Sequence, residues 1–183
     1  MNQVITGNYF EKYGSRNPLV RWIVGQYLAT LYDLIDIAPF SSVLEAGCGE
    51  GEIVRRITAR YAPPELTAFD IDALLIERLR SELPEYSFEQ ASLTEYRTDV
   101  HYDLVLCLEV LEHVPDYREA LARLVDISAG RLILSVPHEP WFRLANILRL
   151  KYLTRLGNTP GHVNNFSRKG FRTLIASSFP HAR

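Results

Sequence analysis

Hydrophobic residues along this chain follow two alternating patterns. Five short apolar runs have the composition of strands, and between most of them apolar residues recur at the three- to four-residue spacing of an amphipathic helix. The expected strands are residues 41–47, 66–70, 86–92, 102–109 and 131–137, and the expected helices between them are residues 52–61, 73–83 and 116–128. This alternation predicts an α/β fold with a doubly wound, mainly parallel sheet.

Sequence signals also mark helix ends. Asn17 and Pro18 form an N-cap and first-turn pair, and apolar residues follow them at helical spacing, so an amphipathic helix should precede the sheet. Asp116 with Glu119 has the spacing of a capping box, and Gly130 has the position of a glycine that terminates a helix. These signals predict that the helix over 116–128 ends just before Gly130.

The length of 183 residues fits one domain. We divide it into an N-terminal helical segment (1–40), a core (41–137) and a C-terminal cap with a final helix (138–183). Cys48 and Cys107 lie in apolar, strand-like stretches and are expected to be packing residues in a reducing compartment. No signal peptide or membrane-spanning run is present, so the expected location is cytoplasmic.

Charge is distributed unevenly along the chain. Residues 1–138 contain 12 Lys and Arg against 21 Asp and Glu, a net charge of −9, whereas residues 139–183 contain 8 against 1, a net charge of +7. A basic cap on an acidic body can steer anionic substrates, or the two parts can simply attract each other. Both interpretations remain open from the sequence.

The segment from Val43 to Gly51 carries the strongest chemical signal. An apolar strand leads into Glu45, and glycines then occupy positions 47, 49 and 51 ahead of a helix. Glycines here allow a tight turn and a close approach of backbone to a ligand. The dinucleotide pattern Gly-x-Gly-x-x-Gly would need glycine at position 52, where this chain has Glu52. The spacing therefore argues against a nicotinamide cofactor, and a Tyr-x-x-x-Lys pair is also missing.

Three segments in order resemble class I S-adenosylmethionine-dependent methyltransferases. They are VLEAGCGEG (43–51), AFDID (68–72) with its acidic residue Asp70, and YDLVLCLEVLEHVPD (102–116), and the last is similar to ubiquinone-biosynthesis-type O-methyltransferases. The resemblance covers roughly residues 40–137. It implies a Rossmann-like fold and S-adenosylmethionine as the cofactor.

Carried over residue by residue, the resemblance implies contacts with each part of that cofactor. Glu45 and the backbone at Gly47 and Gly49 would receive the methionine end, and Asp70 would accept hydrogen bonds from the ribose hydroxyls. Where the family often has an aspartate facing the adenine amino group, this chain has Ser92, whose hydroxyl can accept the same hydrogen bond more weakly. The remaining expected contacts are Ile71 along the adenine, Leu93 next to Ser92, and Leu108 at the sulfonium end.

The resemblance also departs from the family at the C-terminus. Members usually continue after the fifth strand with a strand, a helix and an antiparallel strand, whereas this chain reaches its last residues directly after a helical segment. The sheet is therefore expected to lack the last two of the usual seven strands. An open sheet edge invites pairing, so either a partner chain covers it or the chain is a shortened form, which we favour.

The expected reaction is O-methylation of a hydrophobic small molecule or lipid-like acceptor. His113 is the best-placed general base, although it could instead brace the following helix. Apolar residues cover most of a helix expected near residues 141–150, which predicts a lid over the acceptor with Trp141, Arg143 and His162 as acceptor contacts. Because the Asp/Asn-Pro-Pro motif of DNA amino-methyltransferases is missing, nucleobase amines are not expected as acceptors.

Two alternatives remain. The first is a non-catalytic S-adenosylmethionine-binding module. The second arises from Glu109, Glu112, His113 and His162, whose Glu-x-x-Glu-His pattern resembles the metal-assisted site of small-RNA 2′-O-methyltransferases. A divalent metal and a nucleic-acid acceptor are the less favoured interpretation, and the sequence does not indicate an oligomeric state.

Overall fold

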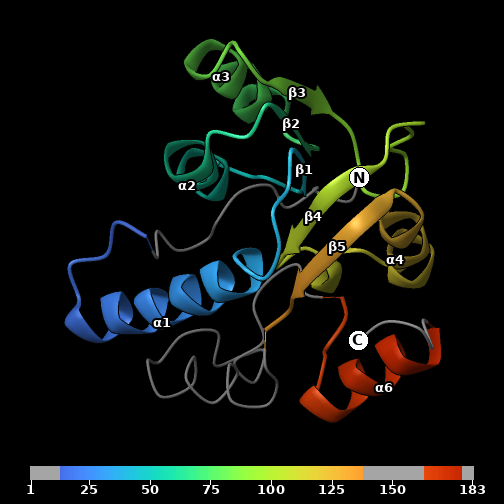
Figure 1. The fold of residues 1–183 in the computed structure, drawn as a ribbon. Coiled ribbons are helices and arrows are strands. Elements are labelled where there is room, and N and C mark those ends of the chain that lie inside the picture. The colour runs from blue at the N-terminus through green and yellow to red at the C-terminus, as the bar shows by residue number, and fades with distance from the viewer. Residues whose placement is uncertain (1–12, 138–162, 179–183) are drawn as a thin grey trace.

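A computed structural model of the chain describes residues 13–137 and 163–178. Its sheet has five parallel strands in the order β3-β2-β1-β4-β5, and helices connect most of the successive strands (Figure 1). The predicted doubly wound α/β fold is confirmed. The elements are α1 (Pro18–Ile35), β1 (Ser42–Ala46), α2 (Glu52–Tyr61), β2 (Glu65–Asp70), α3 (Ala73–Glu82), β3 (Ser87–Gln90), β4 (Tyr102–Leu108), the 3₁₀ turn η1 (Leu111–His113), α4 (Tyr117–Asp126), β5 (Ser128–Ser135) and α6 (Arg168–Ser178).

Helices cover both faces of the sheet. Helices α1, α2 and α3 lie on one face, and α4 and α6 lie on the other (Figure 1). Each face has its own apolar core, with Ile57 and Leu79 among the buried residues of the first and Leu121 and Phe166 among those of the second. A parallel sheet must be covered on both faces, which explains why its central strands are almost continuously hydrophobic.

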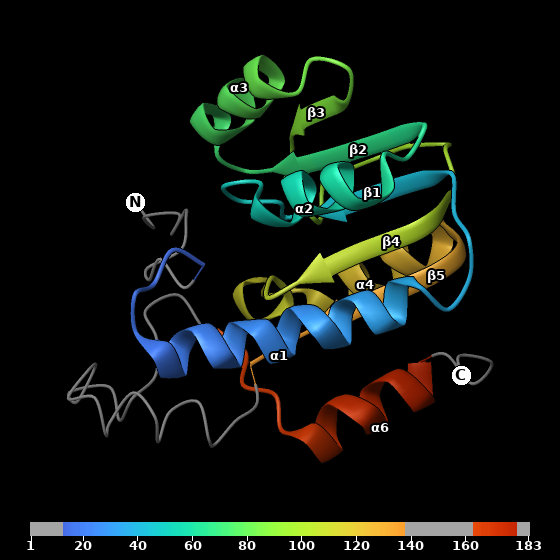
Figure 2. The ribbon, with the colours of Figure 1, turned by 60° about the vertical axis from the view of Figure 1, so that its left-hand side comes forward.

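Helix α1 begins as predicted but is only partly buried. The Asn17 side chain accepts a hydrogen bond from the Leu19 amide at 2.9 Å, and Pro18 occupies the first turn. Near the C-terminal end of the helix Leu31 and Ile35 are buried, whereas Trp22 is 63% exposed. Val20 is also buried in the N-terminal half of α1, which extends beyond the carboxyl end of β4 (Figure 2).

The prediction that Gly130 ends α4 is wrong. The helix ends at Asp126, and Gly130 lies within β5. A Cβ atom at this glycine would collide with the carbonyl oxygen of Asp103, close to a register shift between Tyr102 and Leu104 in the pairing of β4 with β5. Glycine is needed here for close backbone approach in a sheet rather than for a helix terminus.

The capping box predicted at the start of α4 is also wrong in its chemistry. Asp116 occupies the N-cap position, but its side chain makes no capping hydrogen bond. Glu119 pairs instead with Arg123, one helical turn later, at 2.7 Å. The Asp116 side chain therefore does not cap the N-terminus of α4.

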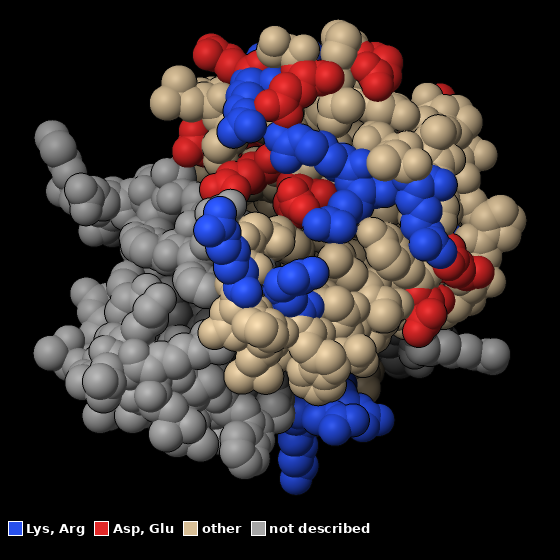
Figure 3. Space-filling model, turned by 90° about the vertical axis from the view of Figure 1, so that its left-hand side faces the viewer, with Lys and Arg blue, Asp and Glu red and all other residues tan. Residues whose placement is uncertain are grey.

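Charged side chains of both signs are interspersed on the face formed by α1, α2 and α3 (Figure 3). Many of them are paired with each other, so charge on this face is largely compensated locally. The pairs are Arg55 with Glu82, Arg56 with Glu52, Arg60 with Asp36, and Arg78 with Glu82. Among the residues described, no helix combines the length and apolar character needed to cross a membrane.

Candidate functional site

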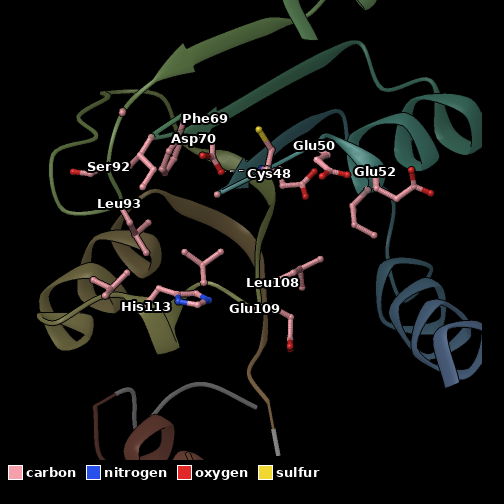
Figure 4. A pocket seen from close by; sticks show the side chains of 18 of the residues that line it. Cys48, Glu50, Glu52, Phe69, Asp70, Ser92, Leu93, Leu108, Glu109 and His113 are labelled. Atoms are coloured by element: carbon pink, nitrogen blue, oxygen red, sulfur yellow. Dashed lines mark hydrogen bonds between the residues drawn. The ribbon is translucent and has the colours of Figure 1, made fainter. Parts of the chain in front are cut away.

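A pocket of about 450 Å³ lies at the carboxyl ends of β1, β2 and β4 (Figure 4). The strand order reverses direction between β1 and β4, and ligands of open α/β sheets bind at such switch points. All eight residues expected to contact the cofactor line this pocket, together with His113. They are Glu45, Gly47, Gly49, Asp70, Ile71, Ser92, Leu93 and Leu108.

The glycine loop after β1 forms one wall of the pocket. Gly47, Gly49 and Gly51 all have positive φ angles, of 74°, 52° and 75°. A Cβ atom at Gly47 would lie 2.6 Å from a methyl group of Val110, whereas at Gly49 it would meet no atom within 4 Å. The loop therefore needs glycine for its backbone conformation, and at Gly49 the backbone is open to a ligand. Helix α2 begins directly after the loop, so its N-terminus faces the pocket.

Glu45 is a buried acid at the base of this wall. Its side chain is only 4% exposed, and among the described residues its Oε2 atom has no hydrogen-bond partner. Burial, and secondarily the charge of Asp70, raise the pKa of Glu45 to about 8. An unpartnered carboxyl oxygen that lines a pocket is suited to a ligand that donates a hydrogen bond or carries positive charge.

Asp70 is held rigidly at the end of β2. Its Oδ2 atom accepts a hydrogen bond from the Gly49 amide at 2.8 Å, and its Oδ1 atom accepts one from the Asp72 amide at 3.0 Å. A carboxylate can accept about four hydrogen bonds, so both oxygens retain a lone pair for a ligand. The same contacts tie the glycine loop to the second strand.

Ser92 lies at the end of the pocket near Asp70 (Figure 4), and Ile71, which follows Asp70 in the sequence, also lines the pocket. Ile71 is 39% exposed, which leaves an apolar surface for a flat ring. The Ser92 hydroxyl donates its proton to Glu95 Oε2 at 2.6 Å. Because that proton is committed, Ser92 can offer a ligand only its lone pairs, which suits the acceptor role predicted for it.

The opposite end of the pocket contains Glu109, which follows β4 directly. Its φ angle is 59°, a left-handed conformation that is uncommon for residues other than glycine. The Glu109 amide donates to the carbonyl oxygen of Ser135 at 3.0 Å, and the Ser135 hydroxyl donates to Glu109 Oε1 at 2.9 Å. The Tyr27 hydroxyl from α1 lies 3.3 Å from that of Ser135.

His113 lies at the mouth of the pocket, on the turn η1. Asn164 anchors this turn, because its side-chain amide donates to the carbonyl oxygens of Leu111 at 3.1 Å and Val114 at 2.6 Å. The backbone N–H of Asn164 also donates to the carbonyl oxygen of Glu112 at 3.1 Å. The segment before α6 thus fixes the position of His113 although it is about 50 residues away in sequence.

Comparison with known proteins identifies the family of the chain. A family described as "Methyltransferase domain" matches residues 23–177. The chain belongs to this family. Trans-aconitate 2-methyltransferase of Agrobacterium fabrum is 31% identical over 110 residues, covering 57% of this chain and 43% of that protein. Ubiquinone biosynthesis O-methyltransferase of Rickettsia bellii is 26% identical over 161 residues, covering 83% of this chain and 63% of that protein.

This methyltransferase domain therefore spans about half the length of the curated relatives that it matches. Solved structures share its fold. The N-methyltransferase NodS from Bradyrhizobium japonicum superposes with a TM-score of 0.62 at 21% identity, covering 88% of this chain and 83% of that one. The plantazolicin methyltransferase BpumL gives 0.72 at 15% identity, covering 91% and 66%. The family membership confirms the predicted class, an S-adenosylmethionine-dependent methyltransferase.

Two tyrosines of the methyltransferase pocket were missed by the sequence analysis. Tyr13 and Tyr27 line it from the N-terminal segment. Burial raises the pKa of Tyr13 to about 12, with smaller contributions from the charges of Glu45, Glu109 and Glu52. Tyr27 lies in the amphipathic helix expected after Pro18, but the sequence does not show that this helix passes over the carboxyl edge of the sheet.

In the alternative metal constellation, Glu112 does not face the pocket with the other two described residues. This residue is 2% exposed and is not part of the pocket lining, and its charge acts on Cys107 in the core on the other face of the sheet. Glu112 and His113 belong to the same 3₁₀ turn, but of the two only His113 lines the pocket, together with Glu109. In residues 13–137 and 163–178 no group of three His, Cys, Asp or Glu is arranged to hold a metal. The expected acceptor contacts Trp141, Arg143 and His162, and with them the lid, lie outside the described residues.

Proposed function

We propose that this domain transfers the methyl group of S-adenosylmethionine to a hydroxyl oxygen of a hydrophobic small-molecule or lipid-like acceptor. The observation that carries the cofactor assignment is the buried, unpartnered oxygen of Glu45 beside the open glycine loop. Asp70 lies across the same loop. A ligand with positive charge at one end and a ribose at the other fits these two carboxyl groups.

Different pocket residues bind different parts of this cofactor. Glu45 faces its cationic methionine end, Asp70 accepts from the ribose hydroxyls, and Ser92 accepts from the adenine amino group. Bound S-adenosylmethionine supplies a methyl group already activated by its sulfonium, so the protein has mainly to orient the acceptor and exclude water. Leu108 and Val110 line the pocket near the end of β4 and provide an apolar boundary there.

His113 is the proposed general base for a hydroxyl acceptor. Val114 and Pro115 follow it in the pocket lining, and Val110 precedes it, so the base lies among apolar groups that suit a hydrophobic acceptor. The imidazole would take the hydroxyl proton as the new carbon–oxygen bond forms, which typically contributes about 10²- to 10⁴-fold to rate. The ubiquinone-biosynthesis relative, whose name specifies O-methylation, supports oxygen as the acceptor atom.

The test is formation of S-adenosylhomocysteine by the purified chain with a panel of acceptors. The panel contains phenols with and without long alkyl chains, and trans-aconitate as a carboxylate acceptor. We expect turnover with the alkylated phenols and a loss of at least about 100-fold in His113→Ala. His101→Ala is the matched control, because His101 is exposed before β4, at the end of the strand opposite to His113.

Each result has a distinct meaning. Turnover of trans-aconitate alone would replace the hydroxyl acceptor by a carboxylate. Cofactor binding without turnover of any acceptor would favour the alternative of a non-catalytic binding module. An equal loss in both histidine variants would remove His113 from its role as base.

A further inference from the structure

Glu109 adopts a backbone conformation that must be held in place. A left-handed φ angle costs a non-glycine residue on the order of 1 kcal/mol, and such conformations persist where surrounding contacts fix them. Ser135 supplies two contacts, one through its carbonyl oxygen to the Glu109 amide and one from its hydroxyl to Glu109 Oε1. The end of β5 therefore fixes both the backbone and the carboxylate of Glu109.

The direction of these hydrogen bonds follows from the proton count. An ionised carboxylate only accepts, so the single hydroxyl proton of Ser135 is directed to Glu109. The contact between Tyr27 and Ser135 must then be donated by the tyrosine. Burial raises the pKa of Tyr27, so the phenol retains the proton that it donates. Residues from α1 and β5 thus hold one carboxylate at the end of β4.

Glu109 lies at the end of the pocket opposite to Asp70 and Ser92, where the proposed function places the methionine part of the cofactor and its sulfonium. Figure 4 shows Glu109 next to Leu108 and away from Asp70 and Ser92. Glu109 and Glu45 both line the pocket with Tyr13, and the charges of both raise the pKa of that tyrosine, so both carboxyl groups are within electrostatic range of it. The buried, unpartnered oxygen of Glu45 independently marks this part of the pocket as one that receives a cationic group.

We infer that the fixed carboxylate of Glu109 makes this pocket discriminate between the sulfonium cofactor and its thioether product. The inference rests on the proposed function. Methyl transfer removes the sulfonium charge, so S-adenosylmethionine and S-adenosylhomocysteine differ by one positive charge at the sulfur. A nearby carboxylate attracts the first more than the second. Glu109 accordingly raises the affinity for cofactor relative to product and favours product release.

The test is the ratio of the two dissociation constants, measured by titration calorimetry at one pH and salt concentration. Glu109→Gln keeps an acceptor for the Ser135 hydroxyl but removes the charge. We expect it to weaken S-adenosylmethionine binding at least about fivefold relative to S-adenosylhomocysteine binding. Glu109→Asp, which retains the charge, should preserve most of the wild-type ratio. Glu77→Gln is the control, because Glu77 is exposed on α3 and does not line the pocket.

The ratio separates an electrostatic role from a structural one. If Glu109→Gln weakens both ligands equally, or neither, the residue does not discriminate by charge and the inference is overturned, while the proposed function stands. If the wild-type chain binds neither ligand, the proposed function fails, and the inference fails with it. Ser135→Ala should also weaken S-adenosylmethionine binding relative to S-adenosylhomocysteine binding, but by a smaller factor than Glu109→Gln. This variant removes the hydroxyl that positions Glu109 and leaves the charge of Glu109 in place.

Discussion

Replacing Glu45 by glutamine should stabilise the cofactor-free protein in a pH-dependent way. Glutamine has nearly the same shape as protonated glutamate but cannot ionise. The pKa of Glu45 is raised from its ordinary value of 4.5 to about 8, first by burial and then by the charge of Asp70. In the folded chain this side chain is therefore largely protonated at neutral pH, and ionising it opposes folding.

The magnitude follows from the difference between the folded and unfolded pKa values. Because the folded value is higher, the contribution of Glu45 to stability is complete below pH 4.5 and is lost as the pH rises to 8. At 1.36 kcal/mol per pKa unit, the loss is on the order of 5 kcal/mol. The advantage of Glu45→Gln should thus be below about 1 kcal/mol at pH 5 and reach roughly 4 to 5 kcal/mol at pH 8.5.

Urea unfolding of both proteins at pH 5 and pH 8.5 measures this difference. Other ionisable groups are common to the two proteins and cancel in the comparison. Glu77→Gln, at an exposed position, should show no such pH dependence. In an Asp70→Asn background the advantage at pH 8.5 should shrink, because the second cause of the raised pKa is removed. A stability difference that is the same at both pH values would show that Glu45 is ionised in the fold and would refute the reasoning.

Three further predictions follow. Asp70→Asn should weaken S-adenosylmethionine binding roughly 10- to 100-fold by calorimetry, because hydrogen bonds to a charged acceptor contribute about 1.5 to 3 kcal/mol. Between pH 6 and 7.5 that affinity should rise with pH in the wild type, since a bound cation favours ionised Glu45, and should not do so in Glu45→Gln. Gly51→Ala should lower the free energy of unfolding in urea by about 1 to 3 kcal/mol, because Gly51 has a φ of 75° and a Cβ atom there would collide with Leu79. Gly25→Ala should raise it by about 0.5 to 1 kcal/mol, because Gly25 lies within α1 and a Cβ atom there would meet no other atom.

The order of strands and helices could be read from the sequence because periodicity is a local property. Asn17 and Pro18 located the start of α1 by the chemistry of a single helix turn. The role of Gly130 was misjudged because the sequence around a glycine that ends a helix does not differ from the sequence around a glycine that packs closely against a neighbouring strand. Its close contact with the Asp103 backbone exists only once β4 and β5 are paired.

In the candidate site, too, some residues could be found from local sequence and others depended on the tertiary structure. Glu45 and Asp70 were found because each stands in a motif at a strand end. Tyr27 was missed because its role depends on the path of α1 across the carboxyl edge of the sheet. Glu112 was misplaced because the direction of a side chain in a short 3₁₀ turn depends on what packs around the turn, here including Asn164.

The sequence by itself determined the α/β alternation, the glycine loop that must turn tightly, and the family that the three motifs resemble. Only the tertiary structure decided which carboxyl groups face the pocket and that the pKa of one of them, Glu45, is raised. The reason is physical: the pKa of Glu45 depends on burial and on Asp70, 25 residues away. The orientation of Glu109 likewise depends on Ser135 and Tyr27, which strand order and helix packing bring together.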